Sequence, residues 1–342
     1  MSTIPRRGLL LGALGVALAA AVTVPAATAG AAACTWTATK LPPLPGSANH
    51  AGAVLGTDGA GTYAGYAYAA QAQHAALWRA GAIVDLGQPL GVPAVATDVN
   101  RAGTAVGYSQ PADGTNISTA LVWRGGVATV LPGTDARAAG INDNGIVVGF
   151  REDAAGHPVG VVWSVTTATP TVVREYAGVT LSAIGADNRI VGTRYAGVTT
   201  TAVKTRPSES TVTPLRALVA GESTVASATA GSYIVGQERI PGSTGARPLV
   251  WLATSQGVLT GTPATVAAVT ATGTAAGVLG DRNTGDAHAA VWPTRLDPPV
   301  RLPDVGTVSG ATSISDDGTQ VGGYWLAAGT GSLDRPVTWA CR

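Results

Sequence analysis

Histidines are the first residues to examine for chemistry, because imidazole binds metals and transfers protons at neutral pH. His74 and His288 occupy the same place in two similar phrases, HAALW and HAAVW, and His157 lies shortly before a third such phrase. No HExxH pattern or cysteine cluster accompanies them. Because the phrases are repeats, these side chains belong to separate structural units. We predict no metal or cofactor site, and we expect each histidine to hydrogen-bond within its own unit.

His50 and Asp98 are the titratable residues nearest to the innermost strands predicted below. A catalytic pair must lie within hydrogen-bond reach. Measured from the glycine that ends each repeated phrase, His50 lies 15 residues before Gly65 (65 − 50) and Asp98 lies 9 before Gly107 (107 − 98). At about 3.3 Å per strand residue, the two side chains are offset by roughly 20 Å along the strands. We therefore predict no catalytic residues.

Acidic residues occur at the tips of several predicted turns, where carboxylates accept hydrogen bonds from backbone N–H groups. The phrases NDNG and SDDG resemble calcium-binding loops, but the regularly spaced acids and the distal glutamate are missing. Turn formation is the preferred interpretation, with calcium binding as the alternative. These acids are Asp58, Asp143, Asp187, Asp316 and Asp317. The sequence has no G-x-S-x-G elbow and no phosphate-binding glycine loop.

Seven copies of one phrase, such as INDNGIVVGF at 141–150, indicate a repeat protein. We call the glycine near the end of each phrase the landmark glycine, and successive copies are 41–45 residues apart. A fixed period of this size is typical of propellers and solenoids. The predicted landmark glycines are Gly65, Gly107, Gly149, Gly192, Gly236, Gly277 and Gly322.

A second landmark is an apolar stretch that closes on tryptophan, at a nearly constant distance after the glycine. The tryptophans are Trp78, Trp123, Trp163, Trp251, Trp292 and Trp339. The fourth copy reads TTAVK, which places Lys204 where the other copies have tryptophan.

Each unit contains four short strands. In the second copy we expect strands at 96–100, 104–109, 119–123 and 127–131, separated by glycine-rich turns. The third copy has Asn144-Gly145 in its first turn, a strong hairpin signal because both residues tolerate positive φ. A chain with 46 glycines among 342 residues also favours turns and strands over long helices.

Four strands per unit, repeated seven times, predict an all-β fold: a seven-bladed β-propeller of four-stranded blades. The last copy lacks a fourth strand, and residues 34–45 hold an orphan strand that supplies it and closes the ring, which leaves no open edge. The first strand of each unit consists of small residues, as the narrow centre of a propeller requires. A superhelical solenoid is the alternative.

The repeats resemble those of the HAF-repeat extracellular proteins, a family named for a His-Ala-Phe triplet before Leu-Trp. Here the triplet is HAALW at 74–78 and HAAVW at 288–292, with alanine in place of phenylalanine. The DLGTLGG ending of that family is reduced to DLG at 85–87 and to LPG elsewhere. The likeness covers residues 46–339. It implies export and a repeated β-blade, and it brings no agreed catalytic residues.

Residues 1–33 are predicted to be an export signal peptide. Arg6 and Arg7 precede a weakly hydrophobic run at 8–24, which ends in small residues that fit the A-x-A cleavage rule. The arginine pair resembles a twin-arginine signal, and a Sec signal is the equal alternative. A retained anchor is disfavoured because the run is weakly hydrophobic and stops at Pro25. No later segment approaches the roughly 20 apolar residues of a membrane span.

Cys34 and Cys341 are the two cysteines, and they lie near the two ends of residues 34–342, the predicted propeller. Export to an oxidising compartment favours a disulfide between them. Lipidation of Cys34, and so an envelope location, is the alternative. The residues before it, Ala31-Ala32-Ala33, lack the leucine usual in lipoproteins.

The surface charge of the exported protein narrows the choice of partners. Without Arg6 and Arg7 the chain carries 19 basic and 20 acidic side chains, for a net charge of −1. A nearly neutral protein without basic runs is a poor partner for nucleic acid or anionic membranes.

We expect a secreted, monomeric, non-catalytic module that binds an extracellular or cell-surface protein or glycan. The alternative is a carbohydrate-active propeller enzyme with its site at the channel mouth. The loops between the second and third strands vary most and all lie on one predicted face, where ligands are commonly bound. The exposed candidates on them are Arg151, Glu152, Glu238, Arg239, Asp281, Arg282 and Trp325.

Overall fold

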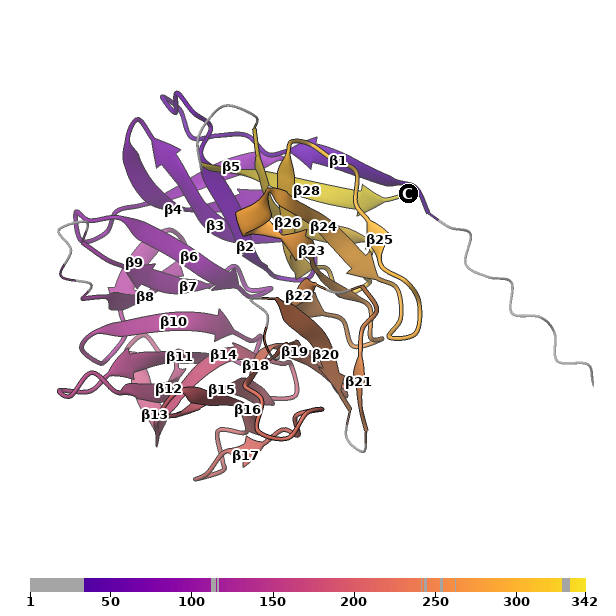
Figure 1. The fold of residues 1–342 in the computed structure, drawn as a ribbon. Helices are drawn as coiled ribbons and strands as arrows, with labels where there is room; N and C mark the ends of the chain where they lie inside the picture. The colour runs from indigo at the N-terminus through magenta and orange to yellow at the C-terminus, as the bar shows by residue number, and fades with distance from the viewer. Residues whose placement is uncertain are drawn as a thin grey trace, which may run out of the picture. The chain divides into compact units, whose positions relative to one another are not determined.

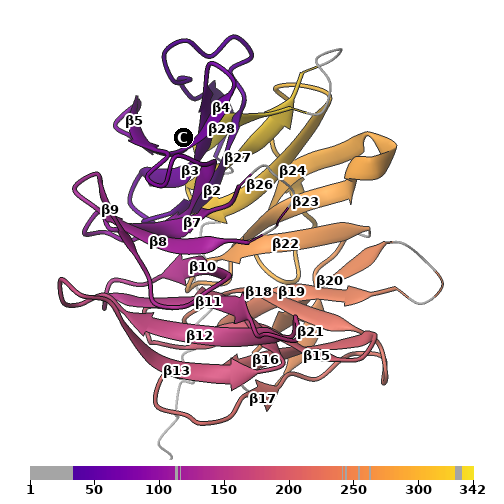
Figure 2. The same cartoon turned by 90° about the vertical axis from the view of Figure 1, so that its left-hand side faces the viewer.

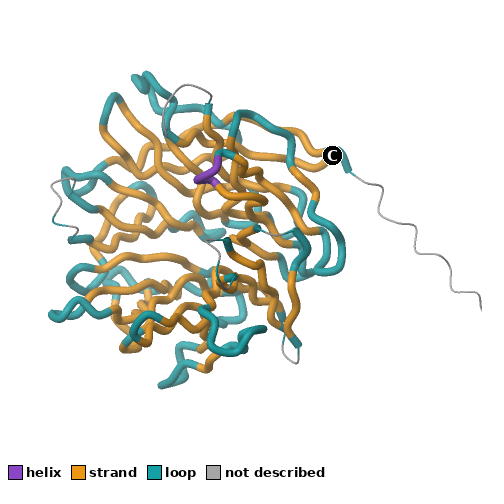
Figure 3. Tube along the Cα trace, viewed as in Figure 1, coloured by secondary structure: helices purple, strands orange, loops and turns teal. Residues whose placement is uncertain are grey.

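The computed structural model describes residues 34–342, except 112–114, 116, 241, 243–244, 253–254, 262, 328–332 and the side chain of residue 283. The predicted export signal at 1–33 lies outside the described residues. Strands dominate the described chain, and one short 3-10 helix, η1 (Arg282–Thr284), lies in a loop (Figure 3). None of the helical structure described is long and apolar enough to cross a bilayer.

The strands form seven antiparallel sheets of four, which are the blades of a β-propeller. Blade 1 comprises β2 (Gly52–Thr57), β3 (Thr62–Ala69), β4 (Ala72–Arg79) and β5 (Ala82–Gly87), and blade 2 comprises β6 (Ala94–Val99), β7 (Ala105–Ser109), β8 (Thr119–Arg124) and β9 (Val127–Val130). Blade 3 comprises β10 (Ala136–Ile141), β11 (Ile146–Glu152), β12 (Pro158–Ser164) and β13 (Thr171–Ala177), and blade 4 comprises β14 (Val179–Ile184), β15 (Ile190–Ala196), β16 (Thr199–Thr205) and β17 (Thr213–Pro214).

Blades 5 to 7 complete the ring, and the ribbon colour passes from indigo to yellow around it (Figure 2). Blade 5 comprises β18 (Thr224–Ala230), β19 (Tyr233–Arg239), β20 (Ala246–Trp251) and β21 (Gln256–Val258), and blade 6 comprises β22 (Ala264–Val269), β23 (Ala275–Asp281), β24 (Asp286–Trp292) and β25 (Val300–Arg301). Blade 7 comprises β26 (Val308–Ile314), β27 (Gln320–Leu326), β28 (Asp334–Cys341) and β1 (Trp36–Lys40).

The ring is closed by the N-terminal strand, as the sequence predicts. β1 pairs antiparallel with β28, from Trp36 opposite Cys341 to Lys40 opposite Val337, and the two strands lie side by side (Figure 1). Thr35 and Arg342 exchange both backbone hydrogen bonds, at 2.9 and 3.1 Å. Both cysteines are disulfide-bonded, and because the sequence has only two, Cys34 is bonded to Cys341.

Each first strand contains a β-bulge at the same place, which the sequence analysis does not anticipate. In blade 3 the pairing of β10 with β11 shifts between Ala138 and Gly140, and the other six blades shift at the equivalent pair. A bulge bends and twists its strand. In six blades the landmark glycine lies opposite the residue that precedes the bulge.

This pairing explains why the repeats carry glycine. A Cβ added to Gly149 would lie 2.0 Å from the carbonyl oxygen of Arg137, and the other blades place a carbonyl of the first strand at 1.9–2.1 Å. In blade 7 the residue in this position is Gly323, which pairs with Ala311, so the prediction of Gly322 is wrong by one residue. Gly323 is therefore the landmark glycine of blade 7. Gly322 instead lies beside Val54 and Tyr63 of blade 1.

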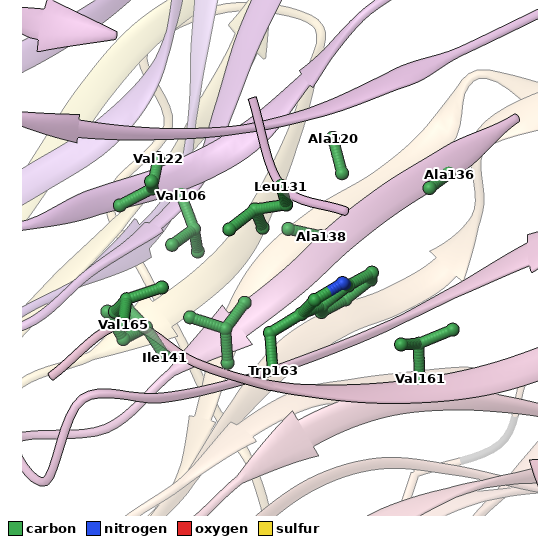
Figure 4. Close-up of a cluster of buried hydrophobic side chains, with 11 residues drawn as sticks. Val106, Ala120, Val122, Leu131, Ala136, Ala138, Ile141, Val161, Trp163 and Val165 are labelled. Carbon is green, nitrogen blue, oxygen red and sulfur yellow. The ribbon is translucent and has the colours of Figure 1, made fainter. Parts of the chain in front are cut away.

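The core is divided among the seven junctions between blades, each with its own hydrophobic cluster. Between blades 2 and 3, Trp163 is fully buried against Leu131 and Val161 (Figure 4). Its Nε1 donates a hydrogen bond to the carbonyl of Pro132 at 2.8 Å. Four further tryptophans donate equivalent bonds to the preceding blade: Trp78, Trp251, Trp292 and Trp339.

Blade 4 has a small residue at the position where the other blades have tryptophan. Val203 pairs with the landmark Gly192, so Thr205 occupies the tryptophan position and the prediction of Lys204 is wrong by one residue. Thr205 is 2% exposed. The space beside it is filled from blade 3 by Tyr176, which stands where blade 2 has Leu131. The Tyr176 hydroxyl donates to the carbonyls of Arg206 and Glu209.

The glycine position gives a first test. Gly149→Ala should lower the free energy of unfolding by about 3 kcal/mol or more, because the new Cβ overlaps a backbone carbonyl that cannot move freely. Urea denaturation measures the change. Gly257→Ala is the matched control on β21, since its Cβ would meet nothing closer than 3.8 Å. Equal losses in the two variants would contradict the explanation.

The junction between blades 3 and 4 gives a second test. Tyr176→Leu leaves a void and Thr205→Trp overfills the site, so each single variant should lose about 1–3 kcal/mol of stability. The double variant recreates the Leu–Trp pair of the neighbouring junction. It should lose at least about 1 kcal/mol less than the sum of the singles, measured by thermal or urea denaturation. Strictly additive losses would show that the two positions do not compensate each other.

Candidate ligand-binding face and channel

The first strands line a narrow central channel. A cavity of about 190 Å³ is bordered by residues of all seven first strands, most of them alanine, glycine, serine or threonine. This composition is the one predicted from the taper of a propeller. We call the end of the channel where the first and second strands are joined the turn face, and the opposite end, with the loops between second and third strands, the loop face.

Asp98 is the acidic exception in the channel. It lies directly after the bulge of β6, opposite Val106. The equivalent residues of the other blades are all small: Gly56, Gly140, Ala183, Ala228, Ala268 and Ser313. Its carboxylate accepts backbone N–H groups of Val99 at 2.9 Å and Ile141 at 3.0 Å, and a third from Thr57. One side chain therefore connects the inner strands of blades 1, 2 and 3.

Burial raises the pKa of Asp98 from 3.8 to about 7, although the three backbone donors oppose the shift. Protein surrounds the carboxyl group, and the exposed part of the residue faces the channel cavity. His50 precedes the start of β2 on the loop face, whereas Asp98 accepts the N–H of Thr57 at the other end of that strand. The structure therefore does not bring His50 and Asp98 together.

On the turn face Asp58, Asp187 and Asp317 accept backbone N–H groups of their own turns, as predicted, whereas the carboxylates of Asp143 and Asp316 bind Arg101 of blade 2. Asp58 accepts the backbone N–H groups of Ala60 and Thr62, both at 2.8 Å. β10 and β11 form the predicted hairpin, in which Gly145 has a φ of +70°, while Asn144 is not among the residues with positive φ. Some contacts also run between blades: the backbone N–H of Arg101 donates to Asp143 at 2.9 Å.

Asparagines link the turns of adjacent blades. Asn100 Nδ2 donates to the carbonyl of Asn142 at 3.2 Å, and Asn142 Nδ2 donates to the carbonyl of Gly185 at 3.1 Å. The Arg101 guanidinium also reaches across the channel mouth to Asp316. Within the described residues no cluster of three or more His, Cys, Asp or Glu side chains could hold a metal ion.

The histidines pair with nearby acids, in agreement with the prediction that they hydrogen-bond locally. His74 lies 2.9 Å from Asp85 on the neighbouring strand of blade 1. His288 lies 3.0 Å from Asp286. His157 lies 3.5 Å from Asp153 in its own hairpin.

Two of the seven loop candidates are buried, so the prediction that they are exposed is wrong. Glu238 is 0% exposed and accepts the backbone N–H groups of Leu218 and Val219 as well as Arg247. It therefore holds a loop in place. Trp325 is 7% exposed and packs in the cluster between blades 6 and 7, with the Lys40 ammonium 4.3 Å from its ring centroid.

Two arginines among the candidates lie on the surface in ion pairs. Arg151 donates from Nε and Nη2 to the two carboxylate oxygens of Glu175, at 2.8 and 3.2 Å. Arg282 donates to Asp334 at 2.8 Å and lies 4.9 Å from the ring centroid of Tyr324. Arg239 and Glu152 end their strands on the loop face with exposed side chains, and Asp281 is less exposed.

The loop face also carries an aromatic arc that the sequence analysis missed. The residue directly after the landmark glycine is aromatic in four consecutive blades, and we call these residues the aromatic arc: Tyr324, Tyr66, Tyr108 and Phe150. All four are half-buried. The Arg137 guanidinium lies 5.1 Å from the Tyr108 ring centroid and 5.9 Å from that of Phe150. An aromatic residue that recurs directly after the landmark glycine is the sequence pattern that predicts this arc.

Charged groups accompany the arc. Burial raises the pKa of the Tyr66 hydroxyl, and the nearby carboxylate of Asp334 raises it further. Burial also raises the pKa of Asp334, which Arg282 opposes. The loop face thus combines neutral hydroxyls, aromatic rings and an arginine–carboxylate pair around the channel end.

No protein-family model matches the chain, and no curated protein matches it. Several solved structures are similar to the chain in fold. A prolyl endopeptidase superposes with a TM-score of 0.57 at 14% identity, covering 84% of this chain and 50% of that one, so this chain spans about half its length. The β-propeller domain of the Trilobed protease from Pyrococcus furiosus, described as having an open velcro topology, gives 0.56 at 10% identity, covering 81% and 91%.

An oligogalacturonate lyase in complex with manganese gives a TM-score of 0.54 at 12% identity, covering 90% of each chain. At identities of 10–14% these likenesses show the fold alone. The chain is thus a β-propeller, and the comparisons assign it no activity.

The titration of Asp98 can be tested through stability. Its pKa is about 7 in the folded protein and 3.8 is the ordinary value, so between these values the folded state retains a proton that the unfolded state has lost. The free energy of unfolding should fall as the pH rises from about 4 to 7, by a few kcal/mol at most. Asp98→Asn cannot titrate.

The stability of the native protein relative to Asp98→Asn should therefore decrease over that pH range, measured by urea denaturation at each pH. A relative increase would mean that the three backbone donors outweigh burial and keep the carboxylate charged.

Proposed function

We propose that this chain is an exported binding module that recognises an extracellular or cell-surface glycan or protein through its loop face. The aromatic arc is the observation that carries the proposal. Aromatic side chains are sparse in the sequence, with eight tyrosines, eight tryptophans and one phenylalanine. Three of those tyrosines and the phenylalanine form the arc. Rigid aromatic rings beside arginine supply much of the binding energy at recognition surfaces.

The channel supports a binding role over catalysis. Catalysis needs several convergent polar groups around a reacting atom. Asp98 is the acid among the described residues bordering the channel cavity, and backbone donors occupy its carboxylate. The cavity beside it is about 190 Å³, below the roughly 300 Å³ from which small-molecule sites usually begin.

Export is the second part of the proposal, and it rests on residues 1–33 and on the disulfide. Disulfides persist in oxidising compartments. The resemblance of the repeats to HAF-repeat extracellular proteins supports the same location, and we propose membership of that family. Intact mass of the exported chain separates a free, oxidised protein from one that carries an acyl group on Cys34.

Binding of the purified exported protein to a glycan array and to intact cell surfaces tests the function. Phe150→Ala should weaken binding roughly tenfold, because a truncated aromatic anchor costs more than about 1 kcal/mol. Leu296→Ala is the control, since Leu296 is 76% exposed between β24 and β25 on the turn face.

Equal binding by the two variants would remove the loop face as the recognition surface. Sensitivity of cell binding to periodate would identify a glycan partner, and sensitivity to protease would identify a protein. Formation of a cleaved sugar product would favour the enzyme instead.

A further inference from the structure

A groove on the loop face, between blades 1 and 2, has the size and lining of a ligand site. Its volume is about 380 Å³, within the roughly 300–1,000 Å³ of small-molecule sites. Aromatic, proline and amide side chains make up most of its lining: Tyr68, Gln71, Gln73, Pro93, Tyr108 and Gln110. Among the described residues that line it, none is charged at neutral pH. An uncharged lining of this kind fits an uncharged ligand.

Tyr68 is held in a fixed orientation on one side of the groove. Its ring packs edge-to-face against Tyr66 with centroids 6.2 Å apart. Its hydroxyl donates to Gln73 Oε1 at 3.1 Å, and Gln88 Nε2 donates to the backbone carbonyl of Gln73 at 3.1 Å. Because this half-buried ring is already restrained, it loses little conformational entropy when a ligand binds.

The opposite side is held by Arg137, which lies outside the groove. Its Nη2 donates to Gln110 Oε1 at 3.1 Å, and its Nε donates to Ser118 Oγ at 2.8 Å. The same guanidinium lies 5.1 Å from the ring centroid of Tyr108. Gln110 and Tyr108 are therefore positioned by one side chain.

The polar chemistry of the groove selects among neutral ligands. Each glutamine amide carries both donors and acceptors. Sugar hydroxyls also donate and accept, and the C–H face of a pyranose ring packs on an aromatic ring. A proline-rich peptide offers mainly carbonyl acceptors, because proline has no N–H. We infer that this groove binds a neutral oligosaccharide, with a pyranose ring against Tyr68 or Tyr108 and its hydroxyls on Gln71, Gln73 and Gln110. The inference rests on the proposed function in its glycan form.

Blade 4 supplies a matched control position. Tyr195 lies three residues after its landmark glycine, as Tyr68 does, and pairs with Thr200 where Tyr68 pairs with Gln73. Its backbone N–H donates to Gly178 as that of Tyr68 donates to Ala51. Tyr195 is 45% exposed and lies outside the groove. Its removal therefore takes away a loop-face tyrosine without changing the groove.

The test is calorimetric titration of the exported protein with cellopentaose, maltopentaose, xylopentaose and chitopentaose. A pentamer of galacturonic acid and a proline-rich decapeptide serve as charged and peptide comparisons. At least one neutral sugar should bind, and Tyr68→Ala should weaken it roughly tenfold while Tyr195→Ala leaves it unchanged. Gln71→Ala, at an exposed position, should weaken it severalfold without affecting folding. Affinity should not change with salt, because no ion pair forms.

Each other result overturns the inference. If none of the neutral sugars binds at millimolar concentration, or if only the acidic pentamer or the decapeptide binds, the groove is not a neutral-sugar site. The same follows if a neutral sugar binds and neither Tyr68→Ala nor Gln71→Ala weakens it. In these cases cell-surface binding that remains sensitive to Phe150→Ala would leave the proposed function standing, so the two failures are distinguishable.

Discussion

The close contact between each landmark glycine and a carbonyl of the adjacent first strand is the constraint on which the propeller depends. The bulge beside that carbonyl bends the first strand, and only a hydrogen atom fits opposite it. Because the contact recurs in all seven blades, it fixes the pairing of first and second strands throughout the ring. The residues that follow the bulge and the glycine are thereby placed too: Asp98 in the channel and the aromatic arc on the loop face.

Packing between blades follows a simpler rule, which is that each junction receives at least one large aromatic side chain. At most junctions a tryptophan of the third strand packs against a leucine of the preceding blade. The junction of blades 3 and 4 differs, because its ring comes from Tyr176 of the preceding blade and Thr205 lies at the tryptophan position. An aromatic ring can therefore enter a junction from either of the two blades that form it.

The repeat period made the fold predictable, because seven similar phrases leave few architectures and the orphan N-terminal strand indicates closure. Residue-level register was less predictable. Gly322 and Gly323 are adjacent, and only the aromatic residue that follows Gly323 distinguishes them. Blade 4 has no tryptophan to mark whether Lys204 or Thr205 faces the preceding blade. Burial of Glu238 and Trp325 depends on partners far along the chain, such as Lys40 and Leu218. The groove between blades 1 and 2 likewise exists only once these two blades have packed together.

Closure by β1 has a consequence for the order in which the molecule is made. Among the strands of the ring, β1 is synthesised before all others and pairs with β28, which is synthesised after them, so the contact joins residues about 300 positions apart, Trp36 and Cys341. Contacts of such long range form slowly, since loop-closure entropy opposes them. Until β28 arrives, β1 has no partner in the ring, and blade 7 has a bare edge that can pair with other chains. Assembly of the ring is therefore complete only after β28 has been synthesised, and the disulfide then fixes the closure covalently.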